Sequence, residues 1–288
     1  IDLYSSQKYI NFNSDDMQVY PPTKGRVELL KSLNKEYFDN ESNESNFCIT
    51  NGGMNSLNII FSTLKVSGIV SSSFYWGSYK NICRSNGINF STYDSFDDLL
   101  NNTKKYKNKA IIICDPNNPV GNSYSDDKLL EVISHLNKNK IVTIFDSPYR
   151  KLFTDNDYTF YKKLLEFDNL IISESFSKSL GLSGLRIGFI HSTNNEFNEE
   201  VMLRIHVDSN GVSNASQLIV EKLLSLPEGK KAVKDFKLKT REGIKKNIEY
   251  LKENGLLSEK FYVGSNPVGI FAIINRSYDE LMENNIGS

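Results

Sequence analysis

Short apolar runs alternate with helical patterns through most of the chain, and this alternation limits the folds that it can adopt. Several runs are almost continuously hydrophobic, which is typical of strands buried on both faces of a sheet. Strands that alternate with helices indicate an α/β fold with a mostly parallel sheet. The sequence therefore predicts a three-layer α/β domain with a seven-stranded sheet. The expected strands are residues 47–50, 68–73, 88–93, 110–115, 141–146, 170–175 and 186–190. The expected helices between them are residues 53–65, 76–86, 95–104, 125–138, 158–167 and 195–206.

The pattern changes after about residue 210 and indicates a smaller α+β unit. Its expected elements are helices at 213–226, 228–254 and 278–285 and strands at 261–264 and 269–274. Gly255 follows the long helix, at a position where glycine commonly ends a helix. We predict a large domain over residues 20–212 and a small domain formed by residues 213–288 together with 1–19, which is either truncated at its C-terminus, the favoured interpretation, or naturally short, with the substrate held differently.

Composition excludes several classes of protein. The chain has 288 residues, a formal net charge of −1 and 24% charged residues, so it lacks the basic excess expected for binding nucleic acid or an anionic membrane. No apolar run is long enough to span a bilayer, and the N-terminal sequence has no secretory signal pattern. The three cysteines and three histidines are scattered, without the spacing of a zinc site or a disulfide framework. These features predict a cytoplasmic protein without a metal.

Ligands in open parallel sheets bind at the carboxyl ends of the strands, so the residues that follow each strand are candidates for a site. The turn at 51–56 opens a helix and would suit a phosphate, although most Gly-Gly turns are only turns. Trp76 either covers a planar ligand or belongs to the core. Asn118 either forms a turn or directs its amide at a ligand. Asp146 ends an apolar run and needs a partner if it is buried, and Tyr149 follows three positions later.

The stretch "SESFSKSLGLSGLRIGF" (173–189) begins in the last residues of the sixth expected strand, after the apolar run 169–173, and holds the lysine with the most suggestive surroundings. Near a buried sheet end, desolvation would lower the pKa of Lys178 and make its amine nucleophilic toward carbonyls. Ser175 and Ser177 would offer hydroxyl donors, and Arg186 a fixed positive group, to a phosphate. The alternative interpretation is an ordinary surface loop.

Six motifs together resemble a known family. In chain order they are "YPPTKG", "TNGGMNS", "YWGSY", "PNNPVG", "DSPY" and "SFSKSLGLSGLRIG", within residues 17–275. This order and spacing resemble the class I/II aminotransferases, which are pyridoxal-5′-phosphate (PLP) enzymes of fold type I. The last motif, Ser-x-Ser-Lys with an arginine eight residues later, is the most specific of the six.

The resemblance implies roles for residues around the cofactor ring. Lys178 would bind the cofactor as a Schiff base and shuttle the proton between the substrate Cα and the cofactor C4′. Asp146 would pair with the pyridine nitrogen and keep it protonated. Tyr149 and Asn118 would hydrogen-bond the 3′ oxygen, and Trp76 would stack on the ring.

The resemblance also implies a phosphate site and a shared active site. The groups that would hold the phosphate are the backbone of Gly53 and Met54, the hydroxyls of Ser175 and Ser177, and the guanidinium of Arg186. Tyr20 matches a tyrosine that reaches the phosphate of the neighbouring subunit, which would make the active unit a homodimer with two shared sites.

The family's arginine for the substrate carboxylate lies late in the small domain, and Arg276 does not occupy that motif. Residues 269–274 would open a sheet that needs further strands to cover it, so we expect the small domain to be truncated at its C-terminus.

These residues predict an aminotransferase that moves an amino group between an amino acid and a 2-oxo acid, with biosynthetic amino-acid metabolism as its setting. Another reaction of an amino acid in the same pocket, such as β-elimination, decarboxylation or cyclisation, is the main alternative, because fold and cofactor motifs do not settle the reaction type. A transcription regulator with an aminotransferase-like domain is less favoured, because no basic helix-turn-helix segment is visible. An α/β domain with coincidental motifs is the remaining alternative.

Overall fold

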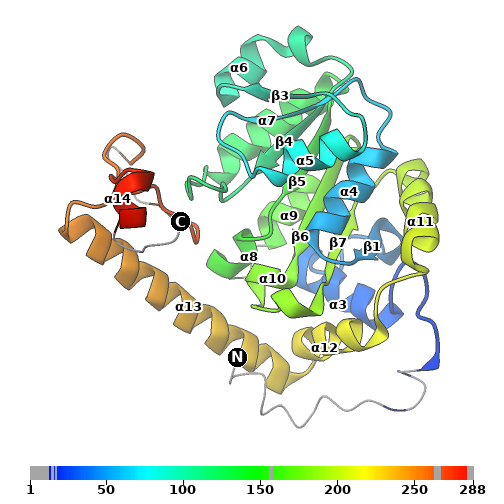
Figure 1. Ribbon diagram of the computed structural model, residues 1–288. Coiled ribbons are helices and arrows are strands. Elements are labelled where there is room, and N and C mark those ends of the chain that lie inside the picture. The colour runs from blue at the N-terminus through cyan, green and yellow to red at the C-terminus, as the bar shows by residue number, and fades with distance from the viewer. Residues whose placement is uncertain (1–12, 14–15, 17, 156–157, 263–266, 284–288) are drawn as a thin grey trace.

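The structure is a computed structural model that describes residues 13, 16, 18–155, 158–262 and 267–283. Its centre is one seven-stranded sheet (Figure 1). The strands are β1 (Phe47–Thr50), β2 (Ile69–Ser72), β3 (Phe90–Tyr93), β4 (Ala110–Cys114), β5 (Val142–Asp146), β6 (Leu170–Ser175) and β7 (Gly188–His191). Their order across the sheet is β1-β7-β6-β5-β4-β2-β3. The pairs β3–β2, β2–β4, β4–β5 and β5–β6 are parallel, whereas β7 is antiparallel to both β6 and β1. The predicted mostly parallel seven-stranded sheet is confirmed.

Side chains alternate between the two faces of the sheet and bury it on both sides. Along β4, Ile111 and Ile113 belong to one apolar cluster, whereas Ile112 belongs to the other. The larger cluster is filled from α3 (Val27–Phe38), α6 (Phe96–Asn101), α7 (Asp126–Lys138), α9 (Tyr158–Leu164) and α12 (Asn214–Ser225). The smaller cluster is filled from α4 (Gly53–Thr63), α5 (Ser78–Ser85) and α11 (Asn195–Ser209). The helices therefore form the two outer layers of the predicted three-layer α/β fold.

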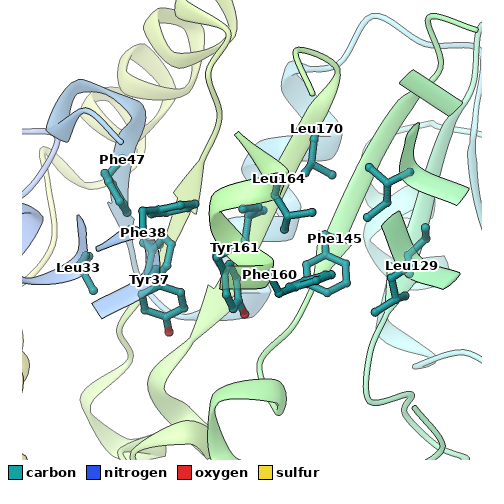
Figure 2. Packing of buried hydrophobic residues seen from close by; sticks show 14 of the residues in the cluster. Leu33, Tyr37, Phe38, Phe47, Leu129, Phe145, Phe160, Tyr161, Leu164 and Leu170 are labelled. Atoms are coloured by element: carbon teal, nitrogen blue, oxygen red, sulfur yellow. The ribbon is translucent and has the colours of Figure 1, made fainter. Parts of the chain in front are cut away.

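Aromatic side chains of the larger cluster pack together beneath the sheet (Figure 2). The rings of Tyr37 and Phe189 pack edge to face with their centroids 4.9 Å apart, and the centroids of Tyr37 and Tyr161 are 5.1 Å apart in the same arrangement. Tyr37 lies on α3, a helix that was not among those predicted. The buried positions of α3 include Leu29, Leu33 and Tyr37, a spacing of four residues that would have indicated it.

The chain after α12 differs in part from the prediction. The long helix α13 (Pro227–Glu253) leads from α12 toward the C-terminal segment that carries α14 (Tyr278–Glu283) (Figure 1). Gly255 has φ +62° directly after the helix, as its predicted helix-ending role requires. Apolar side chains of α12 join the larger cluster, and the division into a large and a small domain stays a prediction.

The prediction of a strand at 269–274 is wrong, because the main chain there does not form the hydrogen bonds of a sheet. Its only β contact in the described residues is an isolated bridge between Leu257 and Ile274. The backbone N–H groups of Val268 and Gly269 instead donate to the carbonyl of Gly121, at 2.7 and 2.8 Å.

Two further predictions fall partly outside the described residues. In the strand predicted at 261–264, residues 261 and 262 are not in a strand, and residues 263 and 264 lie outside the described part. The helix predicted at 278–285 is confirmed over α14, and its last two residues are not described. No helix within the described residues is both long and apolar enough to cross a membrane.

Candidate active site

A cavity of about 240 Å³ lies where the carboxyl ends of β4, β5 and β6 meet the beginning of α4. Every site residue predicted from the sequence lines this cavity, except Tyr20. The lining residues are Gly53, Met54, Leu57, Trp76, Tyr79, Cys114, Asn118, Asp146, Pro148, Tyr149, Ser175, Ser177, Lys178, Ser183 and Arg186. Segments more than 130 residues apart in the sequence therefore meet at one edge of the sheet.

Asp146 ends β5 and is only 4% exposed. Burial raises the pKa of its carboxyl to about 6, although a hydrogen bond from Tyr79 acts in the opposite direction. The Tyr79 hydroxyl donates to Asp146 Oδ2 at 2.5 Å. Tyr79 was missed in the sequence, but it follows Trp76 by three positions in the "YWGSY" motif, and the two rings meet edge to face at 5.7 Å. Asp146 is thus a buried, oriented carboxyl that would gain from a cationic partner.

Tyr149 and Asn118 approach the cavity from neighbouring loops. Asn118 Nδ2 donates to the Tyr149 hydroxyl at 2.9 Å. Burial raises the pKa of the Tyr149 phenol, so the hydroxyl keeps its proton at neutral pH. The ring of Phe271 stands edge to face against Tyr149 at 5.4 Å. The predicted pair is brought together, with its polar ends directed at the same place.

The turn before α4, the end of β6 and Arg186 form a cradle suited to an anion. Gly52 has φ +84°, and a Cβ there would lie 2.8 Å from Arg186 Nη2. A Cβ on Gly53 would lie 3.1 Å from Ser175 Cβ, so both glycines allow the helix N-terminus to close on these groups. The Ser175 hydroxyl donates to Ser177 Oγ at 3.1 Å. Free N–H groups at the start of α4, hydroxyls and a guanidinium make a donor set suited to a phosphate.

Lys178 lines the cavity but is exposed in the single chain, so the desolvation expected near a buried sheet end stays a prediction. It lies on α10 (Phe176–Ser179), a single helical turn that follows β6 directly. Phe176 and Ser179 face the interior and are buried, whereas Lys178 is exposed. The turn therefore carries the amine past the end of the strand, to the mouth of the cavity.

A buried ion pair joins the two loops that carry Asn118 and Tyr149. Arg150 Nη1 donates to Asp115 Oδ2 at 3.0 Å, and neither side chain is more than 5% exposed. Asp115 also accepts from Ser123 Oγ and from the backbone N–H of Tyr124, both at 2.9 Å. This pair was not predicted, because nothing in the sequence relates an aspartate to an arginine 35 positions later.

Tyr20 lies apart from the cavity of its own chain. It is 79% exposed, next to the start of α12. Its predicted contact with a neighbouring subunit stays a prediction.

Residues 7–282 match the family described as "Aminotransferase class I and II". The chain belongs to this family. The aminotransferase family thus accounts for most of the sequence, including every segment that builds the cavity.

Relatives within this aminotransferase family extend the comparison. The chain is 28% identical over 286 residues to the histidinol-phosphate aminotransferase of Brachyspira hyodysenteriae, which covers 93% of this chain and 75% of the relative. It spans only 26% to 53% of the length of four further relatives of that name, including those of Buchnera aphidicola and Sulfurovum sp..

Solved structures of aminotransferases share the fold. An aminotransferase from Anaerococcus prevotii superposes with a TM-score of 0.77 and 23% identity, covering 96% of this chain and 76% of that chain. The aromatic-amino-acid aminotransferase of Burkholderia pseudomallei, described as covalently bound to pyridoxal phosphate, gives a TM-score of 0.73 and 18% identity, covering 86% and 70%.

Removal of the buried guanidinium of Arg150 should destabilise the fold strongly. Arg150→Met leaves Asp115 buried without its arginine, so we expect the free energy of unfolding to fall by about 3 kcal/mol. The matched control is Arg241→Met, whose partner Asp155 is exposed, with an expected loss of about 1 kcal/mol or less. Urea unfolding measures both. Equal losses in the two variants would contradict a special role for the buried pair.

The raised pKa of Asp146 predicts a pH-dependent stability. Between about pH 4 and pH 6 the folded chain holds a proton on Asp146 that the unfolded chain has released, so stability falls as pH rises through this window. The measured quantity is the unfolding free energy of the native protein minus that of Asp146→Asn, both without added cofactor. This difference should decrease by about 3 kcal/mol between about pH 4 and pH 6.

Asp155→Asn provides a control of opposite sign for this measurement. The hydrogen bond from Arg241 lowers the pKa of Asp155, so its contribution grows as pH rises. A difference between the native protein and Asp146→Asn that does not change with pH would refute the assignment.

Proposed function

We propose that the chain is a PLP-dependent aminotransferase that moves an amino group between an amino acid and a 2-oxo acid. The observation that carries the proposal is one cavity that holds a lysine, a buried carboxyl and an anion cradle together. Membership of the aminotransferase family supports it. The name of the Burkholderia structure, which mentions bound pyridoxal phosphate, supports the choice of cofactor.

The residues present fit this cofactor. Its phosphate would lie in the cradle of Gly53, Met54, Ser175, Ser177 and Arg186, where Gly52 and Gly53 have no side chain and leave room for it. PLP supplies an electron sink that stabilises negative charge at the Cα of an amino acid.

Asp146 would face the pyridine nitrogen and hold a proton on it. A carboxyl that is destabilised by burial becomes a better partner once a cation stands beside it, because the pair offsets the desolvation of both groups. Tyr79 holds Oδ2 in place from the side of α5. Asn118 and Tyr149, already joined by a hydrogen bond, would orient the ring through its oxygen substituent, and Trp76 would cover its face.

Lys178 would attach the cofactor through Nζ and later take the proton from the substrate Cα. Both tasks need an amine that reaches into the cavity and changes position between steps. Its place on the single turn α10, exposed beside the buried Ser179, suits such movement. The other cavity residues bind and orient, whereas Lys178 alone would move a proton to or from the substrate.

We further propose a homodimer in which Tyr20 completes the phosphate site of the partner. Tyr20 is largely exposed and lies outside its own cavity, as a residue with that role would. The cytoplasmic location remains a prediction.

A half-reaction tests the proposed function. Addition of an amino acid to the PLP-loaded protein should release the matching 2-oxo acid and leave the pyridoxamine form, measured by absorbance and by mass of the acid. Aspartate and aromatic amino acids are the first amino acids to test, after the names of two of the similar structures. Histidinol phosphate, for which the relatives are named, is tested beside them and would release the corresponding phosphorylated ketone, because it has no carboxyl group. Lys178→Ala should slow the conversion by about 10²- to 10⁴-fold. Release of CO₂, or elimination without the pyridoxamine form, would contradict the transfer reaction and favour the alternative chemistry.

A further inference from the structure

A third buried carboxyl lies behind the site, on the opposite face of the sheet from Asp146. Successive strand residues point to opposite faces, and Ser175 at the end of β6 lines the cavity. The residue before it, Glu174, is fully buried among side chains of the larger cluster. Glu174 does not line the cavity and has no role in the proposed mechanism.

Glu174 is held by hydroxyl groups from three separate elements. Its Oε1 accepts a short hydrogen bond from the Ser147 hydroxyl and another from the Tyr161 hydroxyl at 2.9 Å. Its Oε2 accepts from the Tyr37 hydroxyl at 3.3 Å. The Ser147 and Tyr161 hydroxyls are themselves 3.1 Å apart. The carboxyl therefore ties α3 and α9 to the residue that directly follows Asp146.

The titratable groups around Glu174 come from each element packed against it. They are Tyr37 and Glu36 on α3, Tyr161 on α9, Lys151 on α8 (Arg150–Phe153) and Asp146 on β5. Lys151 Nζ lies over the rings of Tyr37 and Tyr161, at 4.7 and 5.5 Å, and donates to the carbonyl of Glu36 at 2.8 Å. Burial raises the pKa of Glu174 to about 8, with bonds from Ser147 and Tyr161 acting in the opposite direction. At neutral pH the group thus holds a proton, which it donates to one of the surrounding hydroxyl oxygens, and it adds little charge behind Asp146.

Ser147 is the point where this network meets the active-site loop. Its backbone N–H donates to the carbonyl of Ser173 at 3.0 Å, and its own carbonyl accepts from Arg150 N–H at 3.3 Å. The side-chain bond to Glu174 adds a third attachment to this turn, which leads from Asp146 to Tyr149. An apolar residue at position 174 would fill the space without the cost of burying a carboxyl, but it would not hold the turn.

We propose that Glu174 is a positioning residue that fixes the 147–149 turn against β6 and thereby sets where Asp146 and Tyr149 stand relative to Ser175 and Lys178. The inference deepens the proposed function and rests on it only for the part that concerns cofactor binding. The fixed turn itself is a property of the chain alone.

Three variants separate positioning from simple filling of space. Glu174→Gln keeps a neutral group of the same shape, and Glu174→Leu removes the hydrogen bonds of the carboxyl. Ser147→Ala removes the hydroxyl that joins the turn to Glu174 and Tyr161. Ser192→Ala is the matched control, because Ser192 is also a buried serine with a hydrogen bond, to the carbonyl of Leu170 at 3.2 Å, but has no part in the turn.

Amide hydrogen exchange over residues 146–152, and the dissociation constant for PLP, are measured in each variant. Glu174→Leu and Ser147→Ala should lose protection in this segment, and their dissociation constants should rise about tenfold, the factor expected for one to two lost buried hydrogen bonds. Glu174→Gln should have the protection and the dissociation constant of the native protein, and so should Ser192→Ala.

The pH dependence of the PLP dissociation constant is a further test. A residue at position 174 that only filled space would not change it. Above pH of about 8, ionised Glu174 would place a second buried negative charge behind Asp146. The ratio of the PLP dissociation constant of the native protein to that of Glu174→Gln should be near one at neutral pH and depart from one above pH of about 8; a ratio that does not change with pH would contradict a titrating Glu174 behind the site.

The outcomes are distinct. Unchanged protection in Glu174→Leu and Ser147→Ala, or a Gln variant that behaves like the Leu variant, overturns the inference. If the native protein does not bind PLP at all, the proposed function fails, while the exchange data still support or overturn the positioning role. If Glu174→Leu does not fold, Ser147→Ala decides the question.

Discussion

The main-chain hydrogen bonds between β4, β5 and β6 are the constraint on which the rest of the site depends. Parallel pairing places Cys114 opposite Asp146, and Asp146 opposite Ser173. The three strands therefore end together, and the loops that follow them begin side by side at one edge of the sheet. Because the register of parallel strands is fixed by apolar side chains on both faces, the site inherits the rigidity of the core.

Three buried carboxyls near these strand ends each have a different role. Asp146 faces the cavity and is oriented by Tyr79. Asp115 accepts from Arg150 and joins two loops beside the cavity. Glu174 lies behind the sheet and ties the turn after β5 to the surrounding helices. Each costs free energy to bury and is tolerated because its oxygens have partners, so the polar groups that orient the site also make it sensitive to single substitutions.

Local patterns were sufficient to predict the sheet and most of the cavity. Apolar runs located the strands, and the rule that ligands bind at carboxyl ends selected Lys178 and Asp146 among many polar residues. The buried ion pair of Arg150 and the hydrogen-bonded carboxyl of Glu174 could not be predicted in the same way. Their roles depend on contacts between distant segments: the predicted strand 170–175 includes Glu174, but the sequence does not show which side chains surround it. The exposure of Lys178 and the loss of the strand at 269–274 have the same origin, since both depend on how neighbouring elements pack.

The central claim is that this cavity holds a cofactor attached to Lys178. Borohydride reduction of the PLP-loaded protein, followed by peptide mapping with mass spectrometry, tests it most directly. The account predicts one stable adduct, on the peptide that contains Lys178, and none on the peptide with the buried Lys151. An adduct on another lysine, or no adduct at all, would contradict it.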